Sequence, residues 1–133
     1  TLDHLHILLN YQWDSRALLS QVLVGLPELR DRLALRRNRS LYSRLHHRLE
    51  IEPLVPDDTA EYLRLRLRHA GCDRELFATD AAALLHEATA GAMRELDRLA
   101  GVALREAARK KRRLVERDVV ARILDAEAAD RAA

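Results

Sequence analysis

Cysteine, aromatic residues and long apolar runs are all scarce in this sequence. Cys72 is the single cysteine among 133 residues, so an internal disulfide is excluded. Nothing in the chain resembles a signal peptide or an apolar stretch long enough to cross a bilayer. These absences predict a cytoplasmic protein that does not insert into a membrane.

Binding motifs for phosphate and metal are also missing. There is no G-x-x-x-x-G-K-S/T, and no apolar run ends in paired acids that could hold Mg²⁺. The histidines do not supply a metal site, because adjacent His46 and His47 would point to opposite faces of a strand and only one cysteine could join them. His86 and Glu87 are expected on an ordinary helix surface, without an acid–base role. The chain alone should therefore not hydrolyse ATP.

The composition favours helices. Leu, Ala, Arg and Glu dominate, charged residues reach 33%, and the aromatic residues are only one Phe, one Trp and three Tyr. This is typical of packed amphipathic helices. With 133 residues, 48% of them hydrophobic, the chain can bury a single core. The predicted fold class is mostly α.

Positive charge is concentrated in short runs, but its net excess is small. The formal net charge of +2 does not by itself argue for a nucleic-acid partner. The densest basic run is Arg109, Lys110, Lys111, Arg112 and Arg113. It has two interpretations: a solvated helix end, where cations are favourable, or a contact with DNA phosphates, to which Arg36, Arg37 and Arg39 would add a second patch. Any such DNA binding would be salt-dependent and tolerant of sequence.

Two short segments read as strands. Residues 21–25 are a continuous apolar run bounded by Gly25 and Pro27, as in the middle of a parallel sheet. Residues 48–52 alternate apolar and charged, which is typical of a half-solvated edge strand. A helix from Pro27 to about residue 35 would join them as a βαβ unit. Two strands do not complete a sheet, so further strands are expected before Thr1.

After Pro53 and Pro56 the pattern is helical only. The apolar spacing predicts four helices that form a small bundle, over residues 57–69, 80–89 with Thr79 as N-cap, 92–110 and 116–126. The sequence is thus expected to divide into residues 1–54, with the two strands, and residues 55–133, with the helices.

Three segments, in their order, resemble the second half of an AAA+ ATPase. The segment from Leu19 onward, containing QVLVGLPELRDRL, resembles the strand and helix around sensor 1. SRLHHRLEIEPL, residues 43–54, is similar to the segment that holds the arginine finger, and GAMREL, residues 91–96, resembles the G-x-x-R of sensor 2. The resemblance is to the branch of the AAA+ ATPases that includes the ExeA-type secretion ATPases and the TniB-like and Mu B-like transposition ATPases. The resemblance covers nearly the whole chain, which lacks the Walker A and Walker B region.

The resemblance implies the C-terminal part of a P-loop α/β core followed by a four-helix lid, in an intact protein that binds ATP and Mg²⁺ and forms a homo-oligomer. Arg44 would be the arginine finger, acting in trans on the γ-phosphate of a neighbouring subunit. Arg94 would be the sensor 2 contact to an ATP phosphate. Leu26 stands where family members often have a polar sensor 1 residue, and it cannot orient a water. No cofactor is expected on this chain alone.

Several alternatives stay open. Hydrolysis would control either a transposase with its target DNA or a secretion component, and the basic runs slightly favour transposition. Arg44 could instead pair with Glu50 or Glu52, and Arg94 could be an ordinary solvated helix residue. A rival of another class is a freestanding helical adaptor or DNA-binding module without nucleotide chemistry. That reading would leave the predicted strand 21–25 without neighbours.

Overall fold

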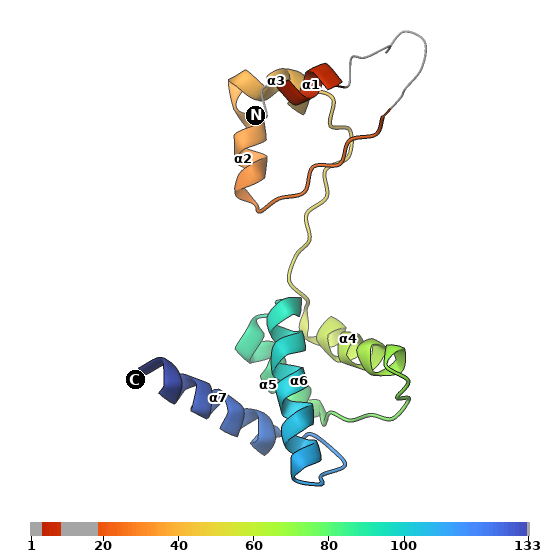
Figure 1. The fold of residues 1–133 in the computed structure, drawn as a ribbon, viewed down its shortest axis with the longest axis vertical. Coiled ribbons are helices and arrows are strands. Elements are labelled where there is room, and N and C mark those ends of the chain that lie inside the picture. Colours follow the sequence, from red (N-terminus) through yellow and green to blue (C-terminus); the bar gives the residue numbers. More distant parts are fainter. Residues whose placement is uncertain (1–3, 9–18, 133) are drawn as a thin grey trace. The chain divides into compact units, whose positions relative to one another are not determined.

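Helices make up the regular structure of the described chain. The computed structural model describes residues 4–8 and 19–132, and no strand forms within them (Figure 1). The chain divides into two compact units, Thr1–Glu50 and Ile51–Ala133. Each unit is described by itself below. The prediction of a mostly α protein is confirmed.

The first unit contains α1 (Leu5–Leu8), α2 (Glu28–Ala34), the 3₁₀ turn η2 (Arg36–Asn38) and α3 (Arg39–Tyr42). Pro27 precedes α2, and Glu28 and Asp31 lie in its first turn, where carboxylates favour the positive end of the helix dipole. This confirms the helix expected after Pro27. Leu33 and Leu41 are buried, and the Asn38 side chain donates from Nδ2 to the carbonyl of Arg32 at 2.6 Å.

The two predicted strands are wrong for this structure. Residues 21–25 and 48–52 carry no strand. Apart from half-buried Leu23, their large apolar side chains lie almost fully in solvent: Val22 is 82% exposed, Val24 89%, Leu49 94% and Ile51 85%. The physical reason is that a strand needs a neighbour to pair its backbone N–H and C=O groups. The described residues supply no such neighbour to either segment, so the α/β core is not formed here.

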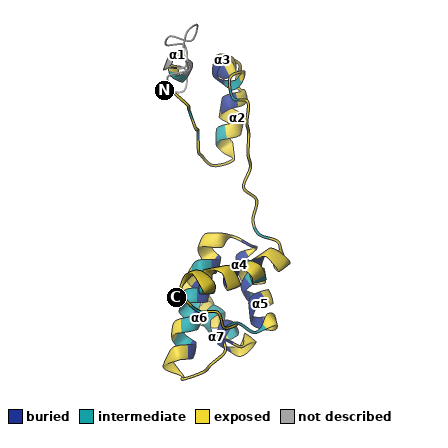
Figure 2. Ribbon diagram, turned by 90° about the vertical axis from the view of Figure 1, so that its right-hand side faces the viewer, coloured by how far each residue is buried: buried dark blue, intermediate teal, exposed yellow. Residues whose placement is uncertain are grey.

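The second unit is the predicted four-helix bundle. It consists of α4 (Pro56–His69), α5 (Thr79–Thr89), α6 (Met93–Arg109) and α7 (Arg117–Ala132) (Figure 2). The helices share one core whose buried members are Leu63, Ala81, Ala82, Leu85, Leu96, Leu99, Ala100, Ala103, Ala107, Val115, Val119 and Val120. Figure 2 shows these buried positions as stripes on the inner faces of the helices. The 3.6-residue period of the apolar positions therefore predicted the bundle correctly.

The helix boundaries differ from the expected ones by one residue at several ends and by six residues at the end of α7. Thr79 is the first residue of α5, not its N-cap; the N-cap is Ala78, and Asp80 Oδ1 accepts the N–H of Ala81 at 2.8 Å instead. Helix α7 runs to Ala132, six residues beyond the expected Ala126, because the alanine-rich sequence there contains no helix breaker. None of these changes alters which faces are buried.

The connections before α5 and α7 are paired with each other. Ala78 N–H donates to the Val115 carbonyl at 2.9 Å, and Val115 N–H donates to the Leu76 carbonyl at 2.8 Å. These bonds form an isolated parallel bridge between Phe77 and Val115. The bridge fixes the starts of α5 and α7 side by side, so the bundle is closed at this end.

Candidate functional site

Arg94 lies in the first turn of α6, where the structure offers a favourable place for an anion. The N-cap residue Ala92 is extended, with φ −70° and ψ 109°, and no side chain caps the helix. The first backbone N–H groups of a helix have no intrahelical acceptor and carry the positive end of the dipole. Arg94 is exposed, and it makes no ion pair within residues 4–8 and 19–132. Its guanidinium and the helix terminus therefore present positive charge together.

The carboxylate next to Arg94 is neutralised by another residue. Glu95 Oε2 accepts from Arg98 Nε at 2.8 Å. Arg98 also donates to both oxygens of Glu127 on α7, from Nη1 at 2.5 Å and from Nη2 at 3.0 Å. Hydrogen bonding from Arg98 lowers the pKa of Glu127 against the opposing effect of burial, and the pKa of Arg98 is raised. The charge of Glu95 is thus held by Arg98, which leaves Arg94 as the unpaired cation of the turn.

A shallow cleft of about 480 Å³ lies beside this turn, between α5, α6 and α7. Apolar side chains and ion-paired ones both line it: Ala88, Thr89, Glu95, Arg98, Leu99, Leu124, Glu127, Ala128 and Arg131. Because its arginines and glutamates pair with one another, the cleft carries little unbalanced charge of its own. Among the described positively charged groups near the start of α6, Arg94 is the one that has no carboxylate partner and so suits an anionic ligand.

Helix α6 is held on its other side by α4. Asp97 accepts from the Tyr62 hydroxyl at 3.1 Å and from Arg66 Nε at 3.2 Å. Burial, followed by the hydrogen bond to Asp97, raises the pKa of the Tyr62 phenol. Contacts to α4 and α7 therefore fix the N-terminal half of α6, on which Arg94 is carried.

Arg44 belongs to the first unit and lies two residues beyond α3. Its Nη1 donates to the carbonyl of Ser40 at 2.9 Å, and its backbone N–H donates to the Leu41 carbonyl at 3.1 Å. Of the two carboxylates considered as partners, Glu50 pairs with Arg30 at 3.0 Å. The side chain of Arg44 is exposed at the surface of its unit. The helix expected to run through Arg44 ends earlier, at Tyr42, and Arg44 lies in the turn that follows it. The strand expected after this turn does not form in the described residues.

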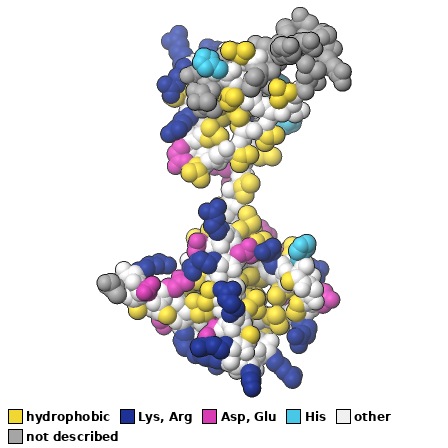
Figure 3. All heavy atoms as spheres, in the orientation of Figure 1, with side chains coloured by type: hydrophobic (Ala, Val, Ile, Leu, Met, Phe, Trp, Pro, Cys, Tyr) yellow, Lys and Arg dark blue, Asp and Glu magenta, His cyan; other side chains and the backbone are white. Residues whose placement is uncertain are grey.

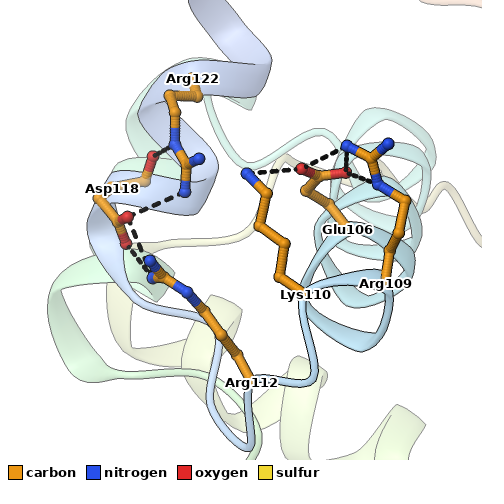
Figure 4. Close-up of polar contacts among 6 residues, drawn as sticks. All are labelled: Glu106, Arg109, Lys110, Arg112, Asp118 and Arg122. Atoms are coloured by element: carbon orange, nitrogen blue, oxygen red, sulfur yellow. Dashed lines mark hydrogen bonds and ion pairs between the residues drawn. The ribbon is translucent and has the colours of Figure 1, made fainter.

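Most of the basic run 109–113 is occupied by carboxylates of the same unit. Glu106 accepts from Arg109 at 3.0 Å and from Lys110 Nζ at 2.8 Å (Figure 4). The hydrogen bonds from Arg109 and then Lys110 lower the pKa of Glu106 to about 2. Two cations of the run are thus compensated by one acid on the preceding turn of α6.

The other part of the run is tied to α7. Arg112 Nη1 lies 3.0 Å from a carboxylate oxygen of Glu116. The same nitrogen lies 2.9 Å from Asp118 Oδ1 (Figure 4). Burial alone would raise the pKa of Asp118, but the hydrogen bond and charge of Arg112 outweigh it and lower the pKa. Within the described residues only Lys111 and Arg113 of this run are without an ion pair. This geometry is that of a paired helix connection, and it weakens the reason for preferring DNA as the partner.

The low pKa of Glu106 makes a stability prediction. Its pKa of about 2 in the folded protein lies below the ordinary value of 4.5 for a glutamate, so its contribution to stability is present above about pH 4.5 and is lost as pH falls toward 2. We expect Glu106→Gln to reduce the difference in Tm between neutral and acidic solution, measured by circular dichroism. Glu61→Gln is the control, since Glu61 is exposed on α4 and has no ion pair in the described chain. An equal effect of both variants would contradict the prediction.

Other sequence candidates are placed without forming a site. Leu26 is exposed next to Pro27, and Cys72 is half-buried after Gly71. Within the described residues, no group of three or more His, Cys, Asp or Glu side chains is arranged to hold a metal ion. His86 is not an ordinary surface residue: it is half-buried, with Nδ1 2.8 Å from the hydroxyl of buried Thr59. The sequence contained no signal for this contact, because the two residues are 27 positions apart.

The described helices include none with the length and apolar character needed to cross a bilayer. No protein-family model matches the chain, and no solved structure matches it significantly.

The geometry defines the class of protein as a helical bundle. Its candidate site is an exposed arginine at a helix start that has no side-chain cap. Among curated proteins, the chain is similar to General secretion pathway protein A of Aeromonas hydrophila, with 34% identity over 119 residues. The matched residues are 89% of this chain and 22% of that protein, so the chain spans about a fifth of its relative's length. The similarity supports the ExeA-like relationship that the three motifs predicted. It lends no support to the transposition branch.

Proposed function

We propose that this chain is the C-terminal part of an AAA+ ATPase, and that its four-helix unit is the lid over a bound nucleotide. The observation that carries this is the position of Arg94, exposed in the first turn of α6 and without an ion pair in the described residues. ATP with Mg²⁺ would be held mainly by residues outside this chain. Arg94 would add a guanidinium contact to a phosphate, reinforced by the helix dipole.

The surrounding charges support an anionic ligand at this position. A free carboxylate at Glu95 would repel a phosphate, but Arg98 holds that carboxylate at 2.8 Å. Arg98 is itself bridged to Glu127, so it does not compete with Arg94 for the ligand. Arg94 is therefore available to a ligand, whereas Arg98 has a structural role in joining α6 to α7.

The exposed apolar segments support a sheet completed by other residues of the intact protein. Val22 and Val24 in one non-helical segment, and Leu49 and Ile51 in another, are all exposed. Leaving such side chains in water is unfavourable by about 25 cal/mol for each Å² of apolar surface. We propose that both segments pair as strands in the α/β core, which places Arg44 at the end of a helix before an edge strand.

The proposed cellular role is in secretion, with ATP hydrolysis in a homo-oligomer regulating a partner. The relative's name, General secretion pathway protein A, supports this choice. Cytoplasmic location is part of the same proposal. Target-DNA handling with a transposase is a second candidate, favoured by Arg36, Arg37 and Arg39, which are exposed and have no ion pair in the described part of the chain.

The test of the lid assignment is Arg94→Ala in the intact protein. Removing a charge-assisted hydrogen bond worth about 1.5–3 kcal/mol should weaken ATP binding about 10- to 100-fold, as measured by isothermal titration calorimetry. Arg105→Ala is the matched control, because Arg105 is exposed on the same helix three turns further along and has no ion pair in the described residues. Unchanged affinity in Arg94→Ala would favour the rival, a helical adaptor without nucleotide chemistry.

A further inference from the structure

The chain enters the helical unit through a backbone contact with the turn before α6. The Leu54 N–H donates to the carbonyl of Gly91 at 3.0 Å. The Leu54 side chain is half-buried and packs against the core of the bundle. Residues 45–53, just before it, carry no helix and are exposed apart from half-buried Leu45. Leu54 is therefore the first residue of this connection that the bundle fixes.

Only glycine fits on the other side of this contact. A Cβ on Gly91 would lie 2.1 Å from the Leu54 carbonyl oxygen and 2.8 Å from its nitrogen. The partner atoms are backbone and cannot swing away as a side-chain tip could. Gly91 also has φ +75°, in the left-handed region that disfavours other residues. Ala90 before it is left-handed too, with φ 47°, so the turn is tightly shaped.

The same turn sets the start of α6. Ala92 N–H donates to the Thr89 carbonyl at 3.0 Å, and Leu96 N–H donates to the Ala92 carbonyl at 2.9 Å. Arg94 lies three residues beyond Gly91. A second attachment follows Leu54 in the chain, where the hydroxyl of Thr59 contacts His86 Nδ1 at 2.8 Å. Leu54 thus contacts the turn that joins α5 to α6, and Thr59, in the first turn of α4, contacts α5 itself.

We propose that Leu54 is a positioning residue for Arg94. Its backbone braces Gly91, so a pull on the connection 45–53 is transmitted through the turn to the first residues of α6. This rests on the proposed role of Arg94 at a phosphate. It adds that the placement of Arg94 depends on where the connecting segment is held, so movement of that segment would change nucleotide affinity.

The first test is hydrogen exchange on this chain with two glycine variants. Gly91→Ala and Gly71→Ala both place a Cβ at a left-handed residue, at φ +75° and φ +81°, but no atom lies within 4 Å of a Cβ on Gly71. We expect Gly91→Ala to accelerate exchange at the Leu54 amide and at Leu96 by about tenfold or more, because both bonds depend on the turn. Gly71→Ala should leave both amides unchanged. Exchange that stays slow at Leu96 while Leu54 is released would overturn the proposal.

A second pair of variants, with smaller expected effects on folding, is used if Gly91→Ala does not fold. Leu54→Ala removes the half-buried side chain but keeps the donor, and Leu49→Ala changes a residue of the same connection that is 94% exposed. Leu54→Ala should accelerate exchange at Leu96, and Leu49→Ala should not. Equal behaviour of the two variants would overturn the proposal.

The second test separates positioning from nucleotide binding itself. In the intact protein, Leu54→Ala should weaken ATP binding several-fold when Arg94 is present and should add nothing in an Arg94→Ala background. Additive losses would overturn the positioning role. If Arg94→Ala alone leaves ATP affinity unchanged while the exchange results hold, the lid assignment fails, but the coupling of Leu54 to the start of α6 through the Gly91 turn stands.

Discussion

Arg44→Ala is expected to lower ATP hydrolysis by the assembled, intact protein about a thousandfold, while ATP affinity stays nearly unchanged. The γ-phosphate oxygens carry spread negative charge in the transition state, and a planar, permanently charged guanidinium stabilises it. Arg44 is an exposed residue whose backbone is tied to the end of α3 by its N–H bond to Leu41. The rate would be measured as a function of protein concentration, since a finger supplied in trans acts only after assembly.

Two variants make this result specific. Arg44→Lys keeps the charge but loses the planar set of donors, so we expect most of the activity to be lost with assembly intact. Arg39→Ala is the control: Arg39 lies in α3, is exposed and has no ion pair in the described residues. It should leave hydrolysis unchanged. Equal loss of ATP binding and hydrolysis in Arg44→Ala would count against a finger.

The helical unit could be predicted because its signals are local. Leu96, Leu99, Ala103 and Ala107 recur at helical spacing and were expected on one face of a helix, and all four are buried. Gly91 was expected to end the preceding helix, and α5 does end just before it, at Thr89, with Ala90 as the left-handed C-cap. Periodicity within one helix is enough for such conclusions, since the neighbouring helices have only to cover the same face.

The two strand predictions were wrong because a strand, unlike a helix, depends on residues far away in the sequence. The apolar run at 21–25 and the alternation at 48–52 describe what each segment would do inside a sheet, but a sheet is made by partners far away in the sequence. Among the described residues Val24 and Ile51 have no such strand partner, and both remain exposed. A pattern that needs distant neighbours predicts a propensity rather than an element.

The features of the candidate site also differ in whether they depend on nearby or on distant residues of the sequence. The place of Arg94 in the first turn of α6 followed from the nearby glycine, which is local information. The pairing of Arg98 with Glu127, 29 positions away, did not, and neither did the bond between Leu54 and Gly91. The sequence showed that the run 109–113 is positively charged. It did not show that Asp118 compensates this charge, because that contact depends on how the chain turns between α6 and α7.

Leu96→Ala is expected to be the most damaging single truncation near the site. Leu96 is fully buried at 0% exposure, two residues beyond Arg94, and the vacated volume should cost about 2–5 kcal/mol of unfolding free energy. A unit the size of Ile51–Ala133 has a total stability of only about 4–12 kcal/mol. The variant should therefore be folded marginally, with a lower urea midpoint and an unchanged m-value.

The matched control for this truncation is Leu65→Ala on α4. Leu65 is 49% exposed, so the same change of side chain should alter stability by only about 0.5 kcal/mol or less. A comparable loss in both variants would mean that burial at Leu96 is not what holds the start of α6. If the difference is found, the start of α6 depends on Leu96 for its attachment to the core and on Leu54 for its direction. A substitution at Leu96 or at Leu54 would then displace Arg94 although Arg94 itself is not substituted.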